Sequence, residues 1–376
     1  MKRWSVMKML VPWFVLFAVT SCGPMSLTGD NNELAGGGIG GTGISVGKIT
    51  AAVNSSVSVN GVAFDTTNAS VTVDGMVGNR SNLKVGMIVK VDGIFNQDGT
   101  TGVAVNIEFK DILEGPVGSV VSNTLVVLGQ TVSVSSSTIF DDFPDINGDG
   151  LFDVNDIMEG NIVEVSGFVD ASGVIHATYI SRKAASIVSD GFEIELKGTI
   201  AKLDSFAMTF TIGSLTIEYN SNTEFKDTSA EVLKNGLYVE VKSSAGTIGN
   251  VLIASKIELE DEGHNLDEGD EFEVEGFVTD TSALLAENKF KLEGQTVLIT
   301  SNTKFENGIN IDNIIVNVKL EVEGTVDAYG VLVADKIEIK AGDDGDSDDS
   351  GDDSDIDSED DSSESDHLEN GENDPS

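Results

Sequence analysis

The chain is short of the residues that most often carry chemistry. It has one cysteine, three histidines, five prolines and two tryptophans among 376 residues. Both tryptophans, Trp4 and Trp13, lie in an N-terminal segment that we expect to be removed, which argues against a platform of stacked aromatic rings. The lone Cys22 excludes an internal disulfide. No HExxH motif is present. The sequence therefore indicates no catalytic residues and a protein that is not an enzyme.

Positive charge is also scarce. The chain has 22 Lys and Arg against 64 Asp and Glu, a net charge of −42. Removal of residues 1–21 would take away three basic residues and leave 19 − 64 = −45. Such a charge repels phosphate backbones, so we expect no nucleic-acid partner. It suits an extracytoplasmic surface that tolerates divalent cations.

Residues 1–21 are predicted to be a signal peptide. Three basic residues precede the apolar run Met9–Val19, which is too short to span a bilayer. The small residues before Cys22 resemble a bacterial lipoprotein processing site, which implies cleavage before Cys22 and lipidation of it. Gly23 follows in place of the Asp of the inner-membrane sorting rule, so the resemblance implies an outer-membrane lipoprotein on the periplasmic or surface face. The alternative is a secretory signal with an incidental cysteine.

Two segments of the chain are predicted to lack a core. Residues 22–43 form a Gly-rich linker, and no Lys-Ser/Thr follows the glycines as a phosphate-binding loop would require. Residues 341–376 are Asp, Ser, Glu and Gly, with 17 acidic residues and no Lys or Arg from Asp343 onward. We expect this acidic tail to be disordered. It would solubilise the protein, bind cations weakly or attach to a basic partner.

A pattern repeats four times between these segments. We assign the copies to residues 44–110, 111–183, 192–260 and 270–340. In the second copy Val163 and Val165 alternate with polar residues, which predicts a strand followed by a second strand up to Ile180. Short strands with glycine turns at this spacing predict an all-β fold of tandem small antiparallel β-barrels of the OB type rather than a sandwich.

Two side-chain patterns add detail to the repeat. Thr-x-Phe recurs in the last three copies and predicts core phenylalanines beside outward-facing threonines, at Phe140, Phe225 and Phe305. The acidic run Glu268–Glu275 alternates like a strand, and we expect it to be a solvated face.

The order of the motifs carries a family resemblance. Gly-x-Ile/Val, Leu-x-Val-x-Gly, Thr-x-Phe, Leu/Ile-x-x-Gly-x-x-Val-x-Val-x-Gly and Ala-x-x-Ile follow one another over residues 44–340. This resembles the bacterial domain of unknown function 5666, which occurs in tandem in lipoproteins. The third copy departs from it with Ser243, and the fourth with Asn317, where glycines are expected. The resemblance implies no functional residues, because the family has no assigned activity.

One segment, residues 145–156, has the spacing of a twelve-residue calcium loop. Ca²⁺ prefers six to eight oxygen ligands, and the loop places a glycine, Gly150, at its sharp turn. The predicted ligands are Asp145, Asn147, Asp149, the Leu151 carbonyl, Asp153 and Asp156. Asp at the last position resembles dockerin and other extracellular loops, but dockerins carry two loops and this chain has one. The alternative is an acidic surface loop with Asp/Asn/Gly turns and no metal.

Three functions remain open from the sequence. The first is a non-enzymatic lipoprotein of the cell envelope, held to the membrane by its lipid anchor, with a structural or interaction role and with structural calcium in one module. The alternative is a module that binds an envelope glycan or protein. An enzyme with paired carboxylates is the third, although no pair stands out among so many acids.

Overall fold

The computed structural model describes residues 41–186, 193–244, 247–260, 264 and 266–340. The predicted signal peptide, Cys22 and the acidic tail lie outside the described residues. Of the predicted linker 22–43, the last three residues are described, and they belong to a strand that begins at Gly41. Within the described ranges, no helix has the length and apolar character needed to cross a membrane.

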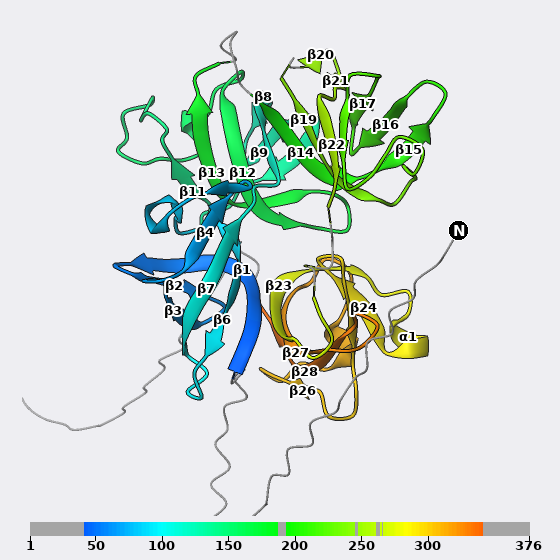
Figure 1. The fold of residues 1–376 in the computed structure, drawn as a ribbon. Helices are drawn as coiled ribbons and strands as arrows, with labels where there is room; N and C mark the ends of the chain where they lie inside the picture. Colours follow the sequence, from blue (N-terminus) through cyan, green and yellow to red (C-terminus); the bar gives the residue numbers. More distant parts are fainter. Residues whose placement is uncertain (1–40, 187–192, 245–246, 261–263, 265, 341–376) are drawn as a thin grey trace, which may run out of the picture. The chain divides into compact units, whose positions relative to one another are not determined.

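The described residues are almost entirely strand, so the prediction of an all-β chain of tandem modules is confirmed (Figure 1). We name the modules barrels 1 to 4. Barrel 1 contains β1 (Gly41–Val53), β2 (Ser56–Val59), β3 (Val62–Asp65), β4 (Ser70–Val73), β5 (Met76–Val77), the 3₁₀ helix η1 (Arg80–Asn82), β6 (Ile88–Phe95) and β7 (Thr101–Phe109). Barrel 2 contains β8 (Leu113–Val121), β9 (Thr124–Val127), β10 (Gln130–Ser133), β11 (Ile139–Asp141), η2 (Val154–Asp156), β12 (Ile162–Val169) and β13 (Ile175–Ala184).

The other two barrels repeat this order of elements. Barrel 3 contains β14 (Ile194–Thr199), β15 (Ala201–Asp204), β16 (Thr209–Ile212), β17 (Leu215–Glu218), β18 (Glu224–Lys226), β19 (Tyr238–Ser243), β20 (Thr247–Ile248), β21 (Val251–Ile253) and β22 (Lys256–Leu259). Barrel 4 contains β23 (Glu271–Asp280), α1 (Leu284–Glu287), β24 (Lys289–Leu292), β25 (Gln295–Leu298), β26 (Lys304–Phe305), η3 (Ile311–Asn313), β27 (Lys319–Val326) and β28 (Leu332–Ile339).

The strand pairings of each barrel close on themselves. In barrel 1 the circuit is β1–β2–β3–β7–β6–β1, a five-strand ring of the size that the OB-type prediction requires. Barrels 2 and 4 follow the same circuit. In barrel 3 the first strand of the circuit is divided into β14 and β15, and the last strand is divided into β21 and β22. The expectation of purely antiparallel barrels is wrong in one respect. Each ring contains one parallel pair, namely β3–β7, β10–β13, β17–β21 and β25–β28.

The Thr-x-Phe motif is oriented differently from the prediction. The hydroxyls of Thr138, Thr223 and Thr303 face inward and donate to an alanine carbonyl at 2.7, 2.8 and 2.7 Å. Two of these alanines lie in the last strand of their barrel, and the third, Ala254, lies just before β22. The phenylalanines, expected in the core, are only partly buried and pack against it. The polar threonine can face inward because the alanine carbonyl satisfies its hydroxyl.

One departure from the family pattern is explained by the backbone. Gly86, Gly160 and Gly236 precede the long strand of barrels 1 to 3 with φ of 95°, 87° and 90°. Asn317 takes this place in barrel 4 with φ of 70°. Asparagine tolerates the left-handed region better than most residues, so the turn survives without glycine.

The first strands of the barrels also pair with one another. β8 of barrel 2 pairs antiparallel with β14 of barrel 3, which we call the β8–β14 joint. β1 of barrel 1 pairs in parallel with β23 of barrel 4 over Gly43–Val46 and Glu271–Val274, which we call the β1–β23 joint. The first strand of each barrel therefore pairs both with strands of its own barrel and with the first strand of another barrel.

Candidate functional site

The calcium-type loop lies between β11 and β12 of barrel 2. Its side-chain oxygens accept backbone N–H groups within the loop. Asp145 accepts from Gly148 N at 2.6 Å and from Gly150 N at 3.0 Å, and Asp149 Oδ1 accepts from Leu151 N at 2.8 Å. Each of these bonds closes a tight turn, as Asx residues do.

Asp156 joins the two ends of this loop. It is fully buried, and its two carboxylate oxygens accept from Ile146 N at 2.7 Å and from Asp153 N at 3.2 Å. Asp153 in turn caps η2 by accepting from Asn155 N at 2.8 Å. The first and last thirds of the loop are therefore joined through one buried carboxylate.

The same capping arrangement occurs in barrels 1 and 4 without the charges. Asn79 and Asn82 form the reciprocal pair around η1, and Asn310 and Asn313 form it around η3. An amide oxygen therefore suffices to cap this 3₁₀ turn. Of these three barrels, only barrel 2 uses two carboxylates, Asp153 and Asp156, as the capping pair. Barrel 2 is also the one that carries the longer loop before this turn.

The predicted loop ligands are not drawn into a tight carboxylate cluster. Among the described residues, the sets of three acidic or histidine side chains with ligand atoms within 4.8 Å of one another lie elsewhere. They are Asp111, Glu114 and Glu164, and Glu240, Glu258 and Glu260. Lysines accompany both sets: Lys183 pairs with Glu114 and Glu164, and Lys256 with Glu240 and Glu258. Both sets are therefore parts of ion-pair networks.

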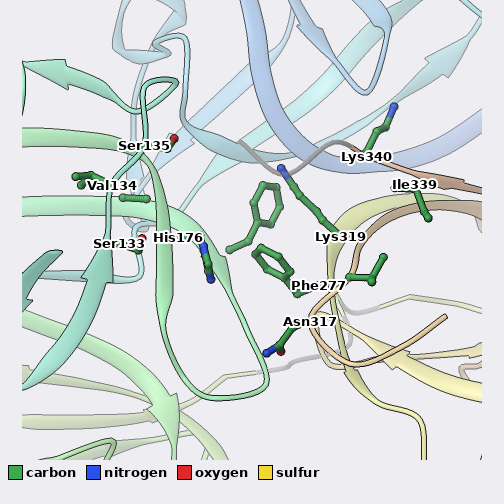
Figure 2. A pocket seen from close by; sticks show the side chains of 12 residues that line it. Ser133, Val134, Ser135, His176, Phe277, Asn317, Lys319, Ile339 and Lys340 are labelled. Atoms are coloured by element: carbon green, nitrogen blue, oxygen red, sulfur yellow. The ribbon is translucent and has the colours of Figure 1, made fainter. Parts of the chain in front are cut away.

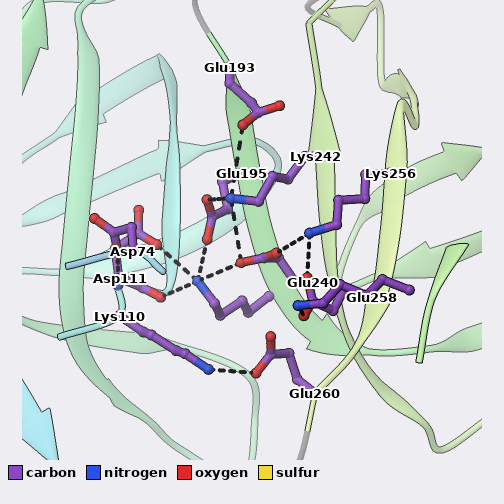
Figure 3. Close-up of polar contacts among 12 residues, drawn as sticks. Asp74, Lys110, Asp111, Glu193, Glu195, Glu240, Lys242, Lys256, Glu258 and Glu260 are labelled. Atoms are coloured by element: carbon purple, nitrogen blue, oxygen red, sulfur yellow. Dashed lines mark hydrogen bonds and ion pairs between the residues drawn. The ribbon is translucent and has the colours of Figure 1, made fainter. Parts of the chain in front are cut away.

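The larger network surrounds Lys197 at the β8–β14 joint. Figure 3 shows the carboxylates of Asp111, Glu195 and Glu240 converging on one point. The Lys197 ammonium lies 3.1 Å from Asp111 Oδ1 and 3.4 Å from Glu240 Oε1, and it also pairs with Glu195. It donates to the Asp111 carbonyl at 2.9 Å. Lys242 adds a second ammonium, 2.6 Å from Glu195 Oε2.

Burial and charge oppose each other in this network. Burial would lower the pKa of Lys197, but Asp111, Glu195 and Glu240 outweigh it and hold that pKa well above its usual value. Burial likewise disfavours ionised Glu195, yet the two lysines keep its pKa low. Glu240 gains less from them, and burial followed by the hydrogen bond to Glu195 raises its pKa to about 7.

The β1–β23 joint has a different chemistry. Ser45 Oγ of β1 donates to Glu273 Oε2 of β23 at 3.0 Å. Glu273 is 5% exposed, and burial, then the nearby Glu321 and Glu323, raise its pKa to about 8 although Lys336 opposes this. The expectation that Glu268–Glu275 is a solvated face is thus wrong at Glu273 and Glu275, because another strand or barrel covers them.

A cavity of about 370 Å³ lies where β12 and β13 approach β23 and β27 (Figure 2). The rings of His176 and Phe277 lie with their centroids 4.6 Å apart and their planes tilted by 43°. The Lys319 ammonium lies 4.4 Å from the centroid of Phe168 and 2.8 Å from Glu275 Oε1. The cavity is therefore lined by aromatic faces together with cationic and amide groups, including Asn317.

The sequence did not single out the residues of these joints. Glu195 and Lys197 alternate with apolar residues in the manner of a solvent-facing strand, so nothing marked them as buried. His176 lines the cavity. The aromatic partner that would have drawn attention to it, Phe277, lies in another repeat.

Comparison with known proteins gives one family. The model of a domain of unknown function, DUF5666, matches four times, at residues 46–108, 114–181, 197–258 and 275–338. These matches cover more than half of the chain. No curated protein matches the chain.

Proposed function

Because the chain belongs to the DUF5666 family, whose description names no activity, we propose its function from its own residues. We propose a membrane-anchored lipoprotein of the cell envelope, non-enzymatic, with a structural or interaction role and with barrel 2 stabilised by calcium. The anchor would be Cys22 and the membrane the outer membrane. The strand pairing and buried ion pairs between barrels support a structural role.

The proposal of bound calcium rests on the two Asp residues that stand around η2 where barrels 1 and 4 have Asn. Barrels 1 and 4 cap the equivalent turn with neutral amides. In barrel 2 the pair Asp153 and Asp156 adds two charges, one of them fully buried, next to a loop that holds Asp145 and Asp149. Buried charge is costly without a counter-charge. The oxygen donor set suits Ca²⁺, which would neutralise these carboxylates.

A thermal melt of the full chain in millimolar CaCl₂ and in EDTA tests this proposal. An ion that binds only the folded state stabilises it by about 2.7 kcal/mol at a hundredfold excess over Kd. We expect calcium to raise Tm in the wild type and not in Asp145→Ala with Asp149→Ala. Asp153→Asn with Asp156→Asn copies the caps of barrels 1 and 4 and should abolish the response while η2 remains.

The matched control is Asp98→Ala, which removes an exposed turn carboxylate from barrel 1. It should leave the calcium response unchanged. If the loop variants respond to calcium as the wild type does, the loop is an acidic turn and the calcium proposal fails.

The anchor needs its own experiment. In bacteria that express the full chain, lipidation would place acyl chains on the N-terminal peptide, visible by mass spectrometry of the membrane fraction. Cys22→Ser should release the protein from that fraction. Equal membrane association of the wild type and Cys22→Ser would contradict the lipid anchor.

The cavity of Figure 2 favours a second candidate, an envelope glycan- or protein-binding module. Aromatic faces beside a few polar groups are typical of ligand sites. Titration calorimetry with soluble peptidoglycan fragments tests it, with Phe277→Ala to remove the stacking face. Absence of heat with the wild type would leave the structural role as the proposal.

A further inference from the structure

Each barrel leaves half of one strand edge uncovered by its own strands. In barrel 1, β6 covers Gly41–Lys48 of β1 on one edge, while β2 covers Ile49–Val53 on the other. Among the described residues, the edge of β1 opposite β6 therefore has no partner strand in barrel 1 over its first half, although the Asn60 side chain donates to the Val46 carbonyl there at 3.1 Å. The same division occurs in β8, in β14 with β15, and in β23. We call this segment the free half-edge, because no strand of its own barrel covers it.

All four free half-edges are occupied by the first strand of another barrel. β8 and β14 cover each other in antiparallel direction, and β1 and β23 in parallel direction. Because both directions occur, the surface recognises an extended strand through its backbone groups and adjacent side chains rather than through one fixed sequence.

Apolar contacts show what a separated barrel 1 would expose. Val46 of β1 is 7% exposed and belongs to the core cluster of barrel 4, not to that of barrel 1. Ile44 and Ile88 pack against the same cluster. Without barrel 4, barrel 1 would present an unpaired edge flanked by apolar side chains, which is a template for pairing with another chain.

We propose that the free half-edge is a docking surface for another barrel of the same kind, and that the β1–β23 joint closes between two copies of the chain as well as within one. Ser45 and Glu273 are 228 residues apart, so no local connection dictates that they come from one chain. The β8–β14 joint holds a network around the buried Lys197, whereas β1 and β23 are joined by the hydrogen bond from Ser45 to Glu273 and by apolar contacts, with Lys90 of β6 donating to the His264 carbonyl beside them. The second joint is therefore the one that exchanges.

Cysteine pairs in the full chain test this proposal. Cys22→Ser removes the one native thiol. Ser45 and Glu273 are direct register partners, and strands pair 4.7–4.9 Å apart, about the Cα separation that a disulfide accepts. A chain with Ser45→Cys is mixed with a differently tagged chain that carries Glu273→Cys, incubated at high concentration, and then oxidised.

We expect a covalent dimer of the two chains, about tenfold above the control mixture, because paired thiols are held in disulfide geometry. The control replaces Ser45→Cys by Val53→Cys, an exposed thiol on β1 outside the joint. Equal yields from the two mixtures would overturn the exchange between copies.

The double variant Ser45→Cys with Glu273→Cys tests the surface itself at low concentration. A disulfide within one chain, seen as faster migration on a non-reducing gel, is the expected result. Failure of this bond to form within or between chains would overturn the free half-edge as a docking surface. Neither result depends on calcium or on the lipid anchor.

Discussion

The two joints both pair the first strands of two barrels, but they arrange their buried charges differently. At the β8–β14 joint, barrels that follow one another in the chain bury an ammonium, Lys197, among three carboxylates. At the β1–β23 joint, barrels from the two ends of the repeat array bury a carboxylate, Glu273, beside two others. Both joints set three carboxylates against two lysines, but the arrangement differs. Lys197 is buried among the carboxylates of the first joint, whereas Lys336 and Lys340 are partly exposed and pair with Glu323 and Glu321 rather than with Glu273. A buried charge network specifies its partner, and a joint whose buried carboxylate has a raised pKa depends on pH.

The largest effect should come from Lys197→Met. The substitution keeps much of the side-chain volume but leaves Asp111, Glu195 and Glu240 buried around an apolar group. Removal of one partner from a buried ion network costs about 3–5 kcal/mol. Denaturant unfolding of the full chain measures this loss. A loss below about 1 kcal/mol, the level of surface ion pairs, would mean that the network does not hold the joint.

Val46→Asp should break the other joint. It places a charge in the apolar contact with barrel 4, and we expect a loss of about 2–3 kcal/mol. Hydrogen exchange should show lower protection in β1 and β23 and unchanged protection in β14. Val53→Asp, on the same strand but 62% exposed, is the matched control and should alter neither joint. A uniform loss of protection in all four barrels would show that the joints are not independent.

The next largest effect should be the pH dependence that Glu273 of the β1–β23 joint gives to the free energy of unfolding. The pKa of Glu273 is raised to about 8 in the folded chain, above its unfolded value of 4.5. The folded state therefore holds a proton that the unfolded state has released, and stability falls as pH rises from about 4.5 to 8. We expect a loss of about 2 kcal/mol between pH 6 and pH 8. Glu273→Gln should reduce the slope by this amount, measured by unfolding of the wild type and the variant at each pH, while the raised pKa values of Glu240 and Glu293 keep part of the slope in both. An unchanged slope would assign the titration to those other groups.

The smallest effect should come from Lys340→Met. Lys340 is 30% exposed and lies 2.9 Å from Glu321 Oε2 near the β1–β23 joint. Burial raises the pKa of Glu321, so this carboxyl can take up a proton when its lysine partner is lost. We expect about 1 kcal/mol or less at pH 6, against the several expected for Lys197→Met. Thermal melts of the two variants side by side give the ratio, and equal losses would contradict the difference between the joints.

Much of each barrel could be predicted from the sequence. The alternation at Val163 and Val165 predicted a strand pair, and the structure has β12 and β13 there. Period-two alternation depends on the pleat of one strand, so it is visible locally. The direction of the Thr-x-Phe side chains was predicted wrongly, because the alanine carbonyl that accepts the threonine bond lies 31 to 39 residues away and leaves no local signal.

The joints could not be predicted for a related reason. A strand of a barrel has one face to the core and one outward face, and polar residues on the outward face suit water and a charged neighbour equally well. Glu195, Lys197 and Glu273 all fit a solvated face by pattern, yet all three are buried. Which face meets another barrel depends on pairings between residues as distant as Ser45 and Glu273. The calcium loop, in contrast, is a contiguous motif, and its metal remains a prediction.

The free half-edge also has an arithmetical consequence. Each barrel contributes one such edge and each joint closes two, so this chain of four satisfies every edge by itself. A tandem chain with an odd count must carry one edge that only another molecule can close. The parity of the repeat number would then decide whether such a chain is self-contained or assembles with others, independently of what any barrel binds.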